Sequence, residues 1–218
     1  MRKEQLLKET QRYRILENAG LSMVQGANFI SVDIQPAYQD YFGFEPWDFG
    51  NYINEVFDTL HNMTFLYNGE DMGFPSEEEY RWWLVEDCGI QEENVAASYF
   101  FDKGYAFFRY CMDEGIDDDD LVQFIQYMVA NNINDSREID AEMWQDFMQY
   151  SGADQSDVRE LMENADDMIH IPEVMDFLKN YGGKIVLTGG GINECLKEVE
   201  IALMALRKPY NVLTQYTY

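Results

Sequence analysis

The chain has 218 residues, of which 46% are hydrophobic and 15% aromatic, so it can bury a sizeable core and is not intrinsically disordered. Its 41 acidic residues against 15 basic ones give a formal net charge of −26, which opposes binding to nucleic acid and to anionic membrane surfaces. The N-terminal segment 1–20 is charged throughout and lacks the apolar core of a signal peptide, and no apolar run is long enough for a membrane span. We therefore expect a single cytoplasmic domain over residues 1–218.

Short apolar runs alternate with segments of helical periodicity. Helices are predicted over residues 4–17, 48–62 and 76–90. Buried strands are predicted for "NFISVDIQ" (28–35), "MTFLYN" (63–68), "NVAASYFFDK" (94–103), "KIVLTGG" (184–190) and "YNVLTQYTY" (210–218). This alternation indicates βαβ units, so the sequence predicts an α/β fold: a three-layer, doubly wound, Rossmann-like parallel sheet with helices on both faces.

Residues 111–167 interrupt this alternation, because they are acidic, contain helical patches and show no strand pattern. We interpret them as an acidic helical insertion of the domain. The run Asp117–Asp120 is expected at a helix N-terminus, where negative charge is favourable. It lacks the central glycine and closing glutamate of a calcium-binding EF-hand loop.

The cysteines and histidines are few and widely spaced. Three cysteines, Cys88, Cys111 and Cys195, predict reduced thiols and neither a disulfide framework nor a CxxC metal site. Cys88 and Cys111 are interpreted as packing residues. With only two histidines in the chain, we predict no metal site and no cofactor.

The stretch "TGGGINEC" (188–195) follows the predicted fourth strand and allows three interpretations. Gly189 and Gly191 fit a dinucleotide-binding loop, but its third glycine is replaced by Glu194, whose carboxylate repels a pyrophosphate. No Gly-Lys-Ser/Thr follows, which excludes a P-loop. Two interpretations then remain: a tight turn with a buried thiol, and a nucleophile loop. The nucleophile loop suits the chemistry of the site, because a helix N-terminus lowers the pKa of a cysteine such as Cys195.

Two further residues favour the nucleophile loop. Asp33 lies near the end of the first predicted strand and Lys103 at the end of the third. In a doubly wound sheet these ends meet the Cys195 loop at one edge. There a carboxylate accepts the thiol proton and an ammonium group stabilises the thiolate.

These motifs resemble the isochorismatase-like cysteine hydrolases, a superfamily that includes nicotinamidase and N-carbamoylsarcosine amidohydrolase. The likeness rests on Asp33 with Gln35, on "DKGYAFF" (102–108), and on Gly189, Asn193 and Cys195 in the nucleophile loop. It covers residues 28–110 and 184–217. It implies an isochorismatase-like fold and a metal-independent hydrolase of a small amide or related C–N bond.

The resemblance also implies roles for individual residues. Cys195 is the nucleophile, Asp33 the proton acceptor, and Lys103 the cation that stabilises the thiolate. Backbone amides from Gly191 to Cys195 hold the oxyanion, in a loop of Gly190, Gly191 and Ile192 whose Gly190–Gly191 peptide is expected to be cis. The substrate pocket is lined by Gln35, Tyr38, Phe42 and Phe107.

The sequence departs from the family at several places. Ile192 stands where the family has Thr or Ser, and "FLYNGEDMGF" (65–74) lacks the Asp-x-His metal motif of nicotinamidases. The alternative is a catalytically inactive isochorismatase-like fold that serves as an acidic protein-binding or assembly module. We expect a small-molecule substrate, no nucleic acid and no membrane, and leave open a homo-oligomer or a protein partner of the acidic insertion. Trp82 and Trp83 are interpreted as core or interface anchors.

Overall fold

The computed structural model describes residues 14–16, 21–69, 76–103, 109–165 and 173–218. These residues fall into two compact units. The sheet unit comprises the described parts of 14–103 together with 180–197 and 209–218, and the helical unit comprises the described parts of 109–179 together with 198–208.

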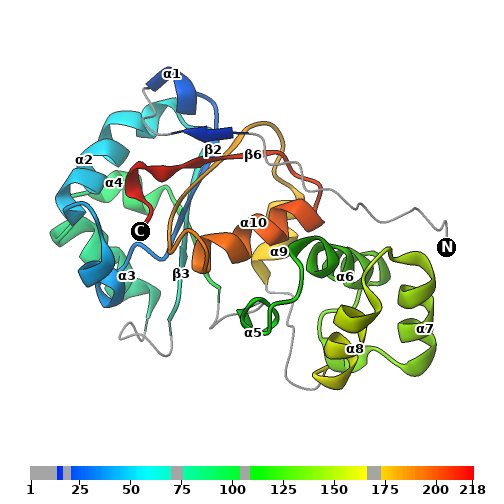
Figure 1. The fold of residues 1–218 in the computed structure, drawn as a ribbon. Coiled ribbons are helices and arrows are strands. Elements are labelled where there is room, and N and C mark those ends of the chain that lie inside the picture. The colour runs from blue at the N-terminus through cyan, green and yellow to red at the C-terminus, as the bar shows by residue number, and fades with distance from the viewer. Residues whose placement is uncertain (1–13, 17–20, 70–75, 104–108, 166–172) are drawn as a thin grey trace. The chain divides into compact units, whose positions relative to one another are not determined.

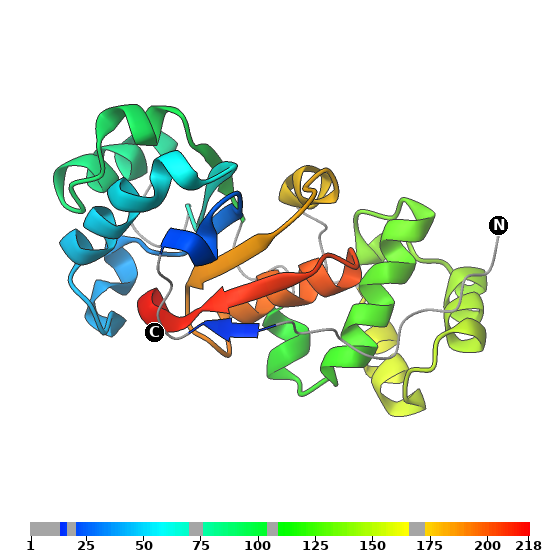
Figure 2. The same ribbon diagram turned by 90° about the horizontal axis from the view of Figure 1, so that it is seen from above.

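The sheet unit is built on a six-stranded sheet in which every pairing is parallel (Figures 1 and 2). Its strands are β1 (Arg14–Leu16), β2 (Asn28–Val32), β3 (Asn62–Tyr67), β4 (Tyr99–Asp102), β5 (Ile185–Gly189) and β6 (Tyr210–Leu213). Their order is β1-β6-β5-β2-β3-β4. This confirms the predicted α/β class with a parallel sheet.

The sheet changes direction of winding between β2 and β5. From β2 the chain proceeds to β3 and β4 on one side, whereas β5 and β6 follow on the other. Ile30 pairs with Thr64 on one neighbour and with Leu187 on the other, and all three side chains are buried. Such a switch point leaves a crevice at the carboxyl ends of the strands, which is where parallel sheets bind ligands.

Both faces of the central strands are covered, in agreement with a three-layer, Rossmann-like arrangement. All five residues of β2 and all five of β5 are buried. One face carries Phe29, Phe65 and Val186, which form a core with Ile53 and Leu84. Alternate residues of one strand point to opposite faces, so a fully buried strand requires layers on both sides.

Four helices belong to the first half of the sheet unit: α1 (Leu21–Val24), α2 (Pro46–Val56), α3 (Glu77–Glu86) and α4 (Glu92–Ala96). Helix α3 begins where the sequence predicts, because the Ser76 hydroxyl accepts a hydrogen bond from the Glu79 amide at 3.2 Å. Short 3₁₀ helices lie at Pro36–Tyr41, Phe57–Thr59 and Thr214–Tyr216.

Several predicted elements differ from the structure. The strand predicted over 28–35 ends at Val32, and the helix predicted over 48–62 ends at Val56. Of the helix predicted over 4–17, only Arg14–Leu16 is described, and it is an edge strand because it pairs with Asn211–Leu213 of β6. The rest of that prediction lies outside the described residues. Residues 94–96 belong to α4, so the third predicted strand begins only at Tyr99. The last predicted strand ends at Leu213 and continues as the 3₁₀ helix Thr214–Tyr216.

The helical unit contains α5 (Arg109–Asp113), α6 (Asp118–Asn131), the 3₁₀ helix Ser136–Glu138, α7 (Ala141–Tyr150), α8 (Gln155–Glu163), α9 (Glu173–Lys179) and most of α10 (Cys195–Ala205). Residues 109–165 contain no strand. The Asp117 carboxylate caps α6 by accepting from the Asp119 amide at 2.9 Å, as expected for this acidic run. Phe124 packs on Trp144 and Phe147 in the core of this unit. That residues 111–167 form an insertion of one domain stays a prediction.

Nowhere in the described part of the chain is a helix both long enough and apolar enough to cross a membrane.

Candidate active site

Asp33 and Lys103 form a buried ion pair at the carboxyl ends of β2 and β4. The Lys103 Nζ lies 2.9 Å from the Asp33 Oδ2, and the two side chains are only 1% and 0% exposed. Asp33 follows β2 directly and takes a left-handed conformation, with φ of 48°. Its amide donates to the Leu66 carbonyl at 2.8 Å, and the Lys103 amide donates to the Tyr67 carbonyl at 2.9 Å. The sheet therefore fixes both backbones that carry the pair.

One carboxylate oxygen of Asp33 is left without a partner. Oδ1 is buried and receives no hydrogen bond from any described residue. A buried charge is costly unless its oxygens are satisfied, and such groups concentrate at functional sites. The unpaired oxygen is therefore available to accept a proton from a group that enters the site.

The loop after β5 brings Cys195 to the same edge of the sheet. β5 ends at Gly189, which pairs with Val32, the residue before Asp33. Gly189 and Gly190 have φ of 81° and 61°, which suits glycine. A Cβ on Gly189 would lie 2.1 Å from the Val32 carbonyl oxygen, and one on Gly190 would lie 3.2 Å from the Cys195 Cβ. The glycines thus let the backbone pass closely between β2 and the start of α10.

The expected cis peptide between Gly190 and Gly191 is wrong, because this bond is trans. The positive φ angles of Gly189 and Gly190 turn the chain instead. The amides expected to bind an oxyanion are also partly occupied. The Ile192 amide donates to the Tyr218 carbonyl at 2.9 Å and the Glu194 amide to the Gly191 carbonyl at 3.0 Å.

Tyr218 is hydrogen-bonded to this loop through its backbone, a contact that the sequence did not predict. Its amide donates to the Gly190 carbonyl at 3.1 Å, and its carbonyl accepts from Ile192. Its hydroxyl donates to the Asp33 carbonyl at 3.0 Å. One residue therefore ties the glycine loop to the end of β2.

The predicted pocket residues take different positions. Gln35 is fully buried, and its amide group exchanges hydrogen bonds with the Asn68 backbone at 2.9 and 3.1 Å. Gln35 thus holds the end of β3 and does not face a ligand. The rings of Tyr38 and Phe42 lie against Tyr218, with centroids 6.1 and 5.2 Å away. Phe107 lies outside the described residues.

Tyr38 interacts electrostatically with all three proposed triad members, and Tyr218 with Asp33 and Cys195. Burial raises the pKa of Tyr38, negative charge on Asp33 and Cys195 adds to this, and the Asn68 hydrogen bond and the Lys103 charge oppose it. Burial also raises the pKa of Tyr218 well above its ordinary value, again with contributions from Asp33 and Cys195. Both phenols therefore remain neutral hydrogen-bond donors at physiological pH.

The three cysteines differ in their surroundings. All are free and buried. Burial raises the pKa of Cys88 strongly and that of Cys111 to about 12, so both remain thiols at neutral pH. Of the three, only Cys195 begins a helix after a glycine loop, and Tyr38 interacts electrostatically with it as well as with Asp33 and Lys103.

The described residues contain no cluster of three or more His, Cys, Asp or Glu side chains arranged to hold a metal ion. No protein-family model, no curated protein and no solved structure matches the chain.

Proposed function

We propose that the protein is a cysteine hydrolase that cleaves a small amide or related C–N bond with Cys195, Asp33 and Lys103. The observation that carries this proposal is the buried Asp33–Lys103 pair, whose second carboxylate oxygen has no partner among the described residues. An acid and an amine held in this way beside a loop that bears a thiol are the components of covalent hydrolysis. The isochorismatase-like assignment belongs to the same proposal.

The first half of the reaction forms a thioester. Oδ1 of Asp33 takes the thiol proton, and the Cys195 sulfur forms a bond to the substrate carbonyl carbon. The positive charge of Lys103 stabilises the anionic sulfur. The tetrahedral intermediate collapses as the C–N bond breaks, and the proton on Asp33 passes to the leaving amine.

The second half regenerates the enzyme. Water attacks the thioester carbonyl while Asp33 takes one of its protons. The C–S bond then breaks, the acid is released, and the proton returns to the Cys195 sulfur. No electron transfer is involved, and the products are one amine and one acid.

The amides of Gly191 and Asn193 are the best oxyanion donors in this loop. Those of Ile192 and Glu194 have carbonyl partners, whereas the structure gives Gly191 and Asn193 no acceptor among the described residues. Backbone amides aimed at a developing oxyanion lower the barrier because they need no reorganisation.

Competitive alkylation tests the proposal. The protein is treated with iodoacetamide at mildly acidic pH, and modification of each cysteine is followed by mass spectrometry of tryptic peptides. We expect fast labelling of Cys195 and slow labelling of Cys88 and Cys111. Asp33→Asn and Lys103→Met should slow Cys195 labelling about tenfold or more, since a lower thiolate fraction lowers the rate. Asp176→Asn and Lys179→Met, which change an exposed ion pair of α9, serve as controls.

Equal, slow labelling of all three cysteines would overturn the proposal. If Cys195 labels selectively, a library of primary amides, ureas and carbamoyl compounds is screened for amine release, with Cys195→Ala as the blank. Intact-mass spectrometry should then detect an acyl adduct on the wild-type protein and none on Cys195→Ala.

The second candidate function is an inactive fold that binds a protein partner. The complete burial of Asp33 and Lys103, together with the 5% exposure of Cys195, favours it. In that case the ion pair only holds the strand ends together, and alkylation of Cys195 responds to neither Asp33→Asn nor Lys103→Met.

A further inference from the structure

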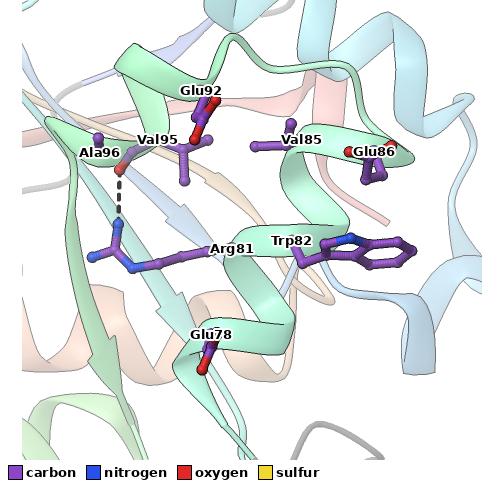
Figure 3. A pocket seen from close by; sticks show the side chains of 8 residues that line it. All are labelled: Glu78, Arg81, Trp82, Val85, Glu86, Glu92, Val95 and Ala96. Atoms are coloured by element: carbon purple, nitrogen blue, oxygen red, sulfur yellow. Dashed lines mark hydrogen bonds between the residues drawn. The ribbon is translucent and has the colours of Figure 1, made fainter.

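A surface groove lies in the sheet unit between α3 and α4, within a single stretch of chain. Its volume is about 370 Å³. It is lined by Glu78, Arg81, Trp82, Val85, Glu86, Glu92, Val95 and Ala96 (Figure 3). None of these residues belongs to the proposed catalytic machinery.

Adjacent tryptophans of α3 divide the helix into a core side and a groove side. Trp83 is 5% exposed and packs in the core with Tyr80, whereas Trp82 is 62% exposed. Of the two roles expected for these tryptophans, Trp83 therefore has that of a core anchor, whereas Trp82 is left for an interface. An exposed indole is a large apolar surface that the fold does not use, and tryptophan is enriched in interface hot spots.

The groove carries an unbalanced negative charge. Residues 77–93 contain seven acidic residues and one basic residue, Arg81. Arg81 is already engaged: it lies 2.7 Å from Glu77, donates to the Val95 carbonyl at 2.9 Å and stacks 3.7 Å over the Phe100 ring. Its charge is offset by Glu77, so Glu78, Glu86 and Glu92 remain as exposed carboxylates around the groove.

The side chains give the groove one chemical preference. In the view of Figure 3, Trp82 and Glu86 extend to the same side of α3, while Arg81 extends to the other side toward Val95. A guanidinium group stacks on an indole and binds a carboxylate through two parallel hydrogen bonds. Its alkyl stem requires an apolar wall, which Val85 and Ala96 provide.

We propose that this groove binds an arginine side chain within an extended basic segment of a partner protein. The guanidinium stacks on Trp82 and pairs with Glu86, and flanking cations interact with Glu78 and Glu92. The net charge of −26 attracts such a segment and repels phosphate-bearing ligands. This proposal is independent of the proposed hydrolase.

Fluorescence anisotropy with a labelled peptide of alternating arginine and glycine tests the proposal on the full chain. A peptide of the same length in which citrulline replaces arginine has the same shape without the charge. We expect binding of the arginine peptide only. Trp82→Ala should raise its Kd by about fivefold or more, as expected for the loss of one cation–π contact. Thermal unfolding of Trp82→Ala should match the wild type, because the side chain is exposed.

A matched charge control separates the groove from the general acidity of the chain. The triple variant Glu78→Gln/Glu86→Gln/Glu92→Gln is compared with Glu45→Gln/Glu138→Gln/Glu163→Gln, whose glutamates are exposed elsewhere. Both variants remove the same charge. We expect the groove variant to weaken binding at least about fivefold more than the control variant, because close charges outweigh distant, screened ones.

Three results would overturn the proposal. In the first, both triple variants bind alike and Trp82→Ala has no effect, which shows non-specific attraction. In the second, the citrulline peptide binds as well as the arginine peptide. In the third, sedimentation shows self-association that Trp82→Ala abolishes while no peptide binds, which assigns the groove to a second copy of the chain. Cys195→Ala should bind the peptide normally, so failure of the hydrolase proposal leaves this test intact.

Discussion

The Tyr218 hydroxyl donates a hydrogen bond to the backbone carbonyl of Asp33 at 3.0 Å. The same residue pairs through its backbone with Gly190 and Ile192. The two loops that carry the acid and the thiol of the proposed site therefore share one support. This support depends on a hydroxyl that can be removed without changing the ring.

Tyr218→Phe should lower the free energy of unfolding by about 1–2 kcal/mol, because the Asp33 carbonyl loses its phenolic donor in a buried place. Urea denaturation followed by circular dichroism measures the loss. The exposed Tyr41, at 70% exposure, provides the control Tyr41→Phe, which should leave stability unchanged. An equal effect of the two variants would show that the hydroxyl of Tyr218 contributes nothing.

Lys103→Met should destabilise the protein by about 3–5 kcal/mol, because the Asp33 carboxylate is then buried without its cation. Adding Asp33→Asn to this variant removes the uncompensated charge. The double variant should therefore be more stable than Lys103→Met alone. A double-mutant cycle measured by urea denaturation gives the coupling, and additive losses would contradict direct pairing of the two charges.

Gly189→Ala and Gly183→Ala separate steric conflict from backbone strain. Both glycines have positive φ, of 81° and 76°, so each alanine pays about 1–2 kcal/mol for the left-handed conformation. Only at Gly189 does the new Cβ collide with a neighbour, 2.1 Å from the Val32 carbonyl oxygen, whereas Gly183 has nothing within 4 Å. Gly189→Ala should cost about 1–3 kcal/mol more, measured by thermal or urea unfolding.

The free energy of unfolding should fall as the pH rises from 9.0 to about 12. Burial raises the pKa of Cys111 from 9.0 to about 12 and the pKa values of Tyr52 and Tyr216 from 10.0 to about 12. Over this window the unfolded chain has lost these protons while the folded chain keeps them. The unfolded state then binds fewer protons, so stability decreases with pH. Urea denaturation at several alkaline pH values measures the slope.

Tyr52→Phe provides the control for this pH dependence. The Tyr52 hydroxyl is buried and has no hydrogen-bond partner among the described residues. Its removal should leave stability at neutral pH unchanged or raise it by about 1 kcal/mol, and should flatten the alkaline slope. A slope identical to that of the wild type would show that Tyr52 does not keep its proton.

The central strands could be predicted because their sequences are unambiguous. "NFISV" is a short run of apolar and β-branched residues, and β2 is buried on both faces as such a run implies. Arg14–Leu16 could not be predicted in this way. Its leucine- and lysine-rich neighbourhood favours a helix, and the pairing with Asn211–Leu213 that makes it a strand is a tertiary contact.

The part of the candidate site that lies at the ends of strands could be predicted from the sequence. Asp33 and Lys103 each follow a predicted strand, and parallel strands bring their carboxyl ends to one edge, so their proximity follows from topology. Tyr218 carries no such signal, because its contacts with Asp33 and the glycine loop come from how the segment after β6 folds back. The φ angles that replace the expected cis bond are likewise set by close contacts that a sequence does not specify.

The position of β1 beside β6 has a consequence for the order in which the strands of the sheet can pair during synthesis. Ile15 pairs with Val212, so 212 − 15 = 197 positions separate the two residues. During synthesis β1 therefore leaves the ribosome almost 200 residues before β6, its only partner among the described strands. The pair β2–β3 can form early, whereas β1 stays unpaired until β6 has been made. β1 is therefore made before the other described strands and is among the last of them to join the sheet.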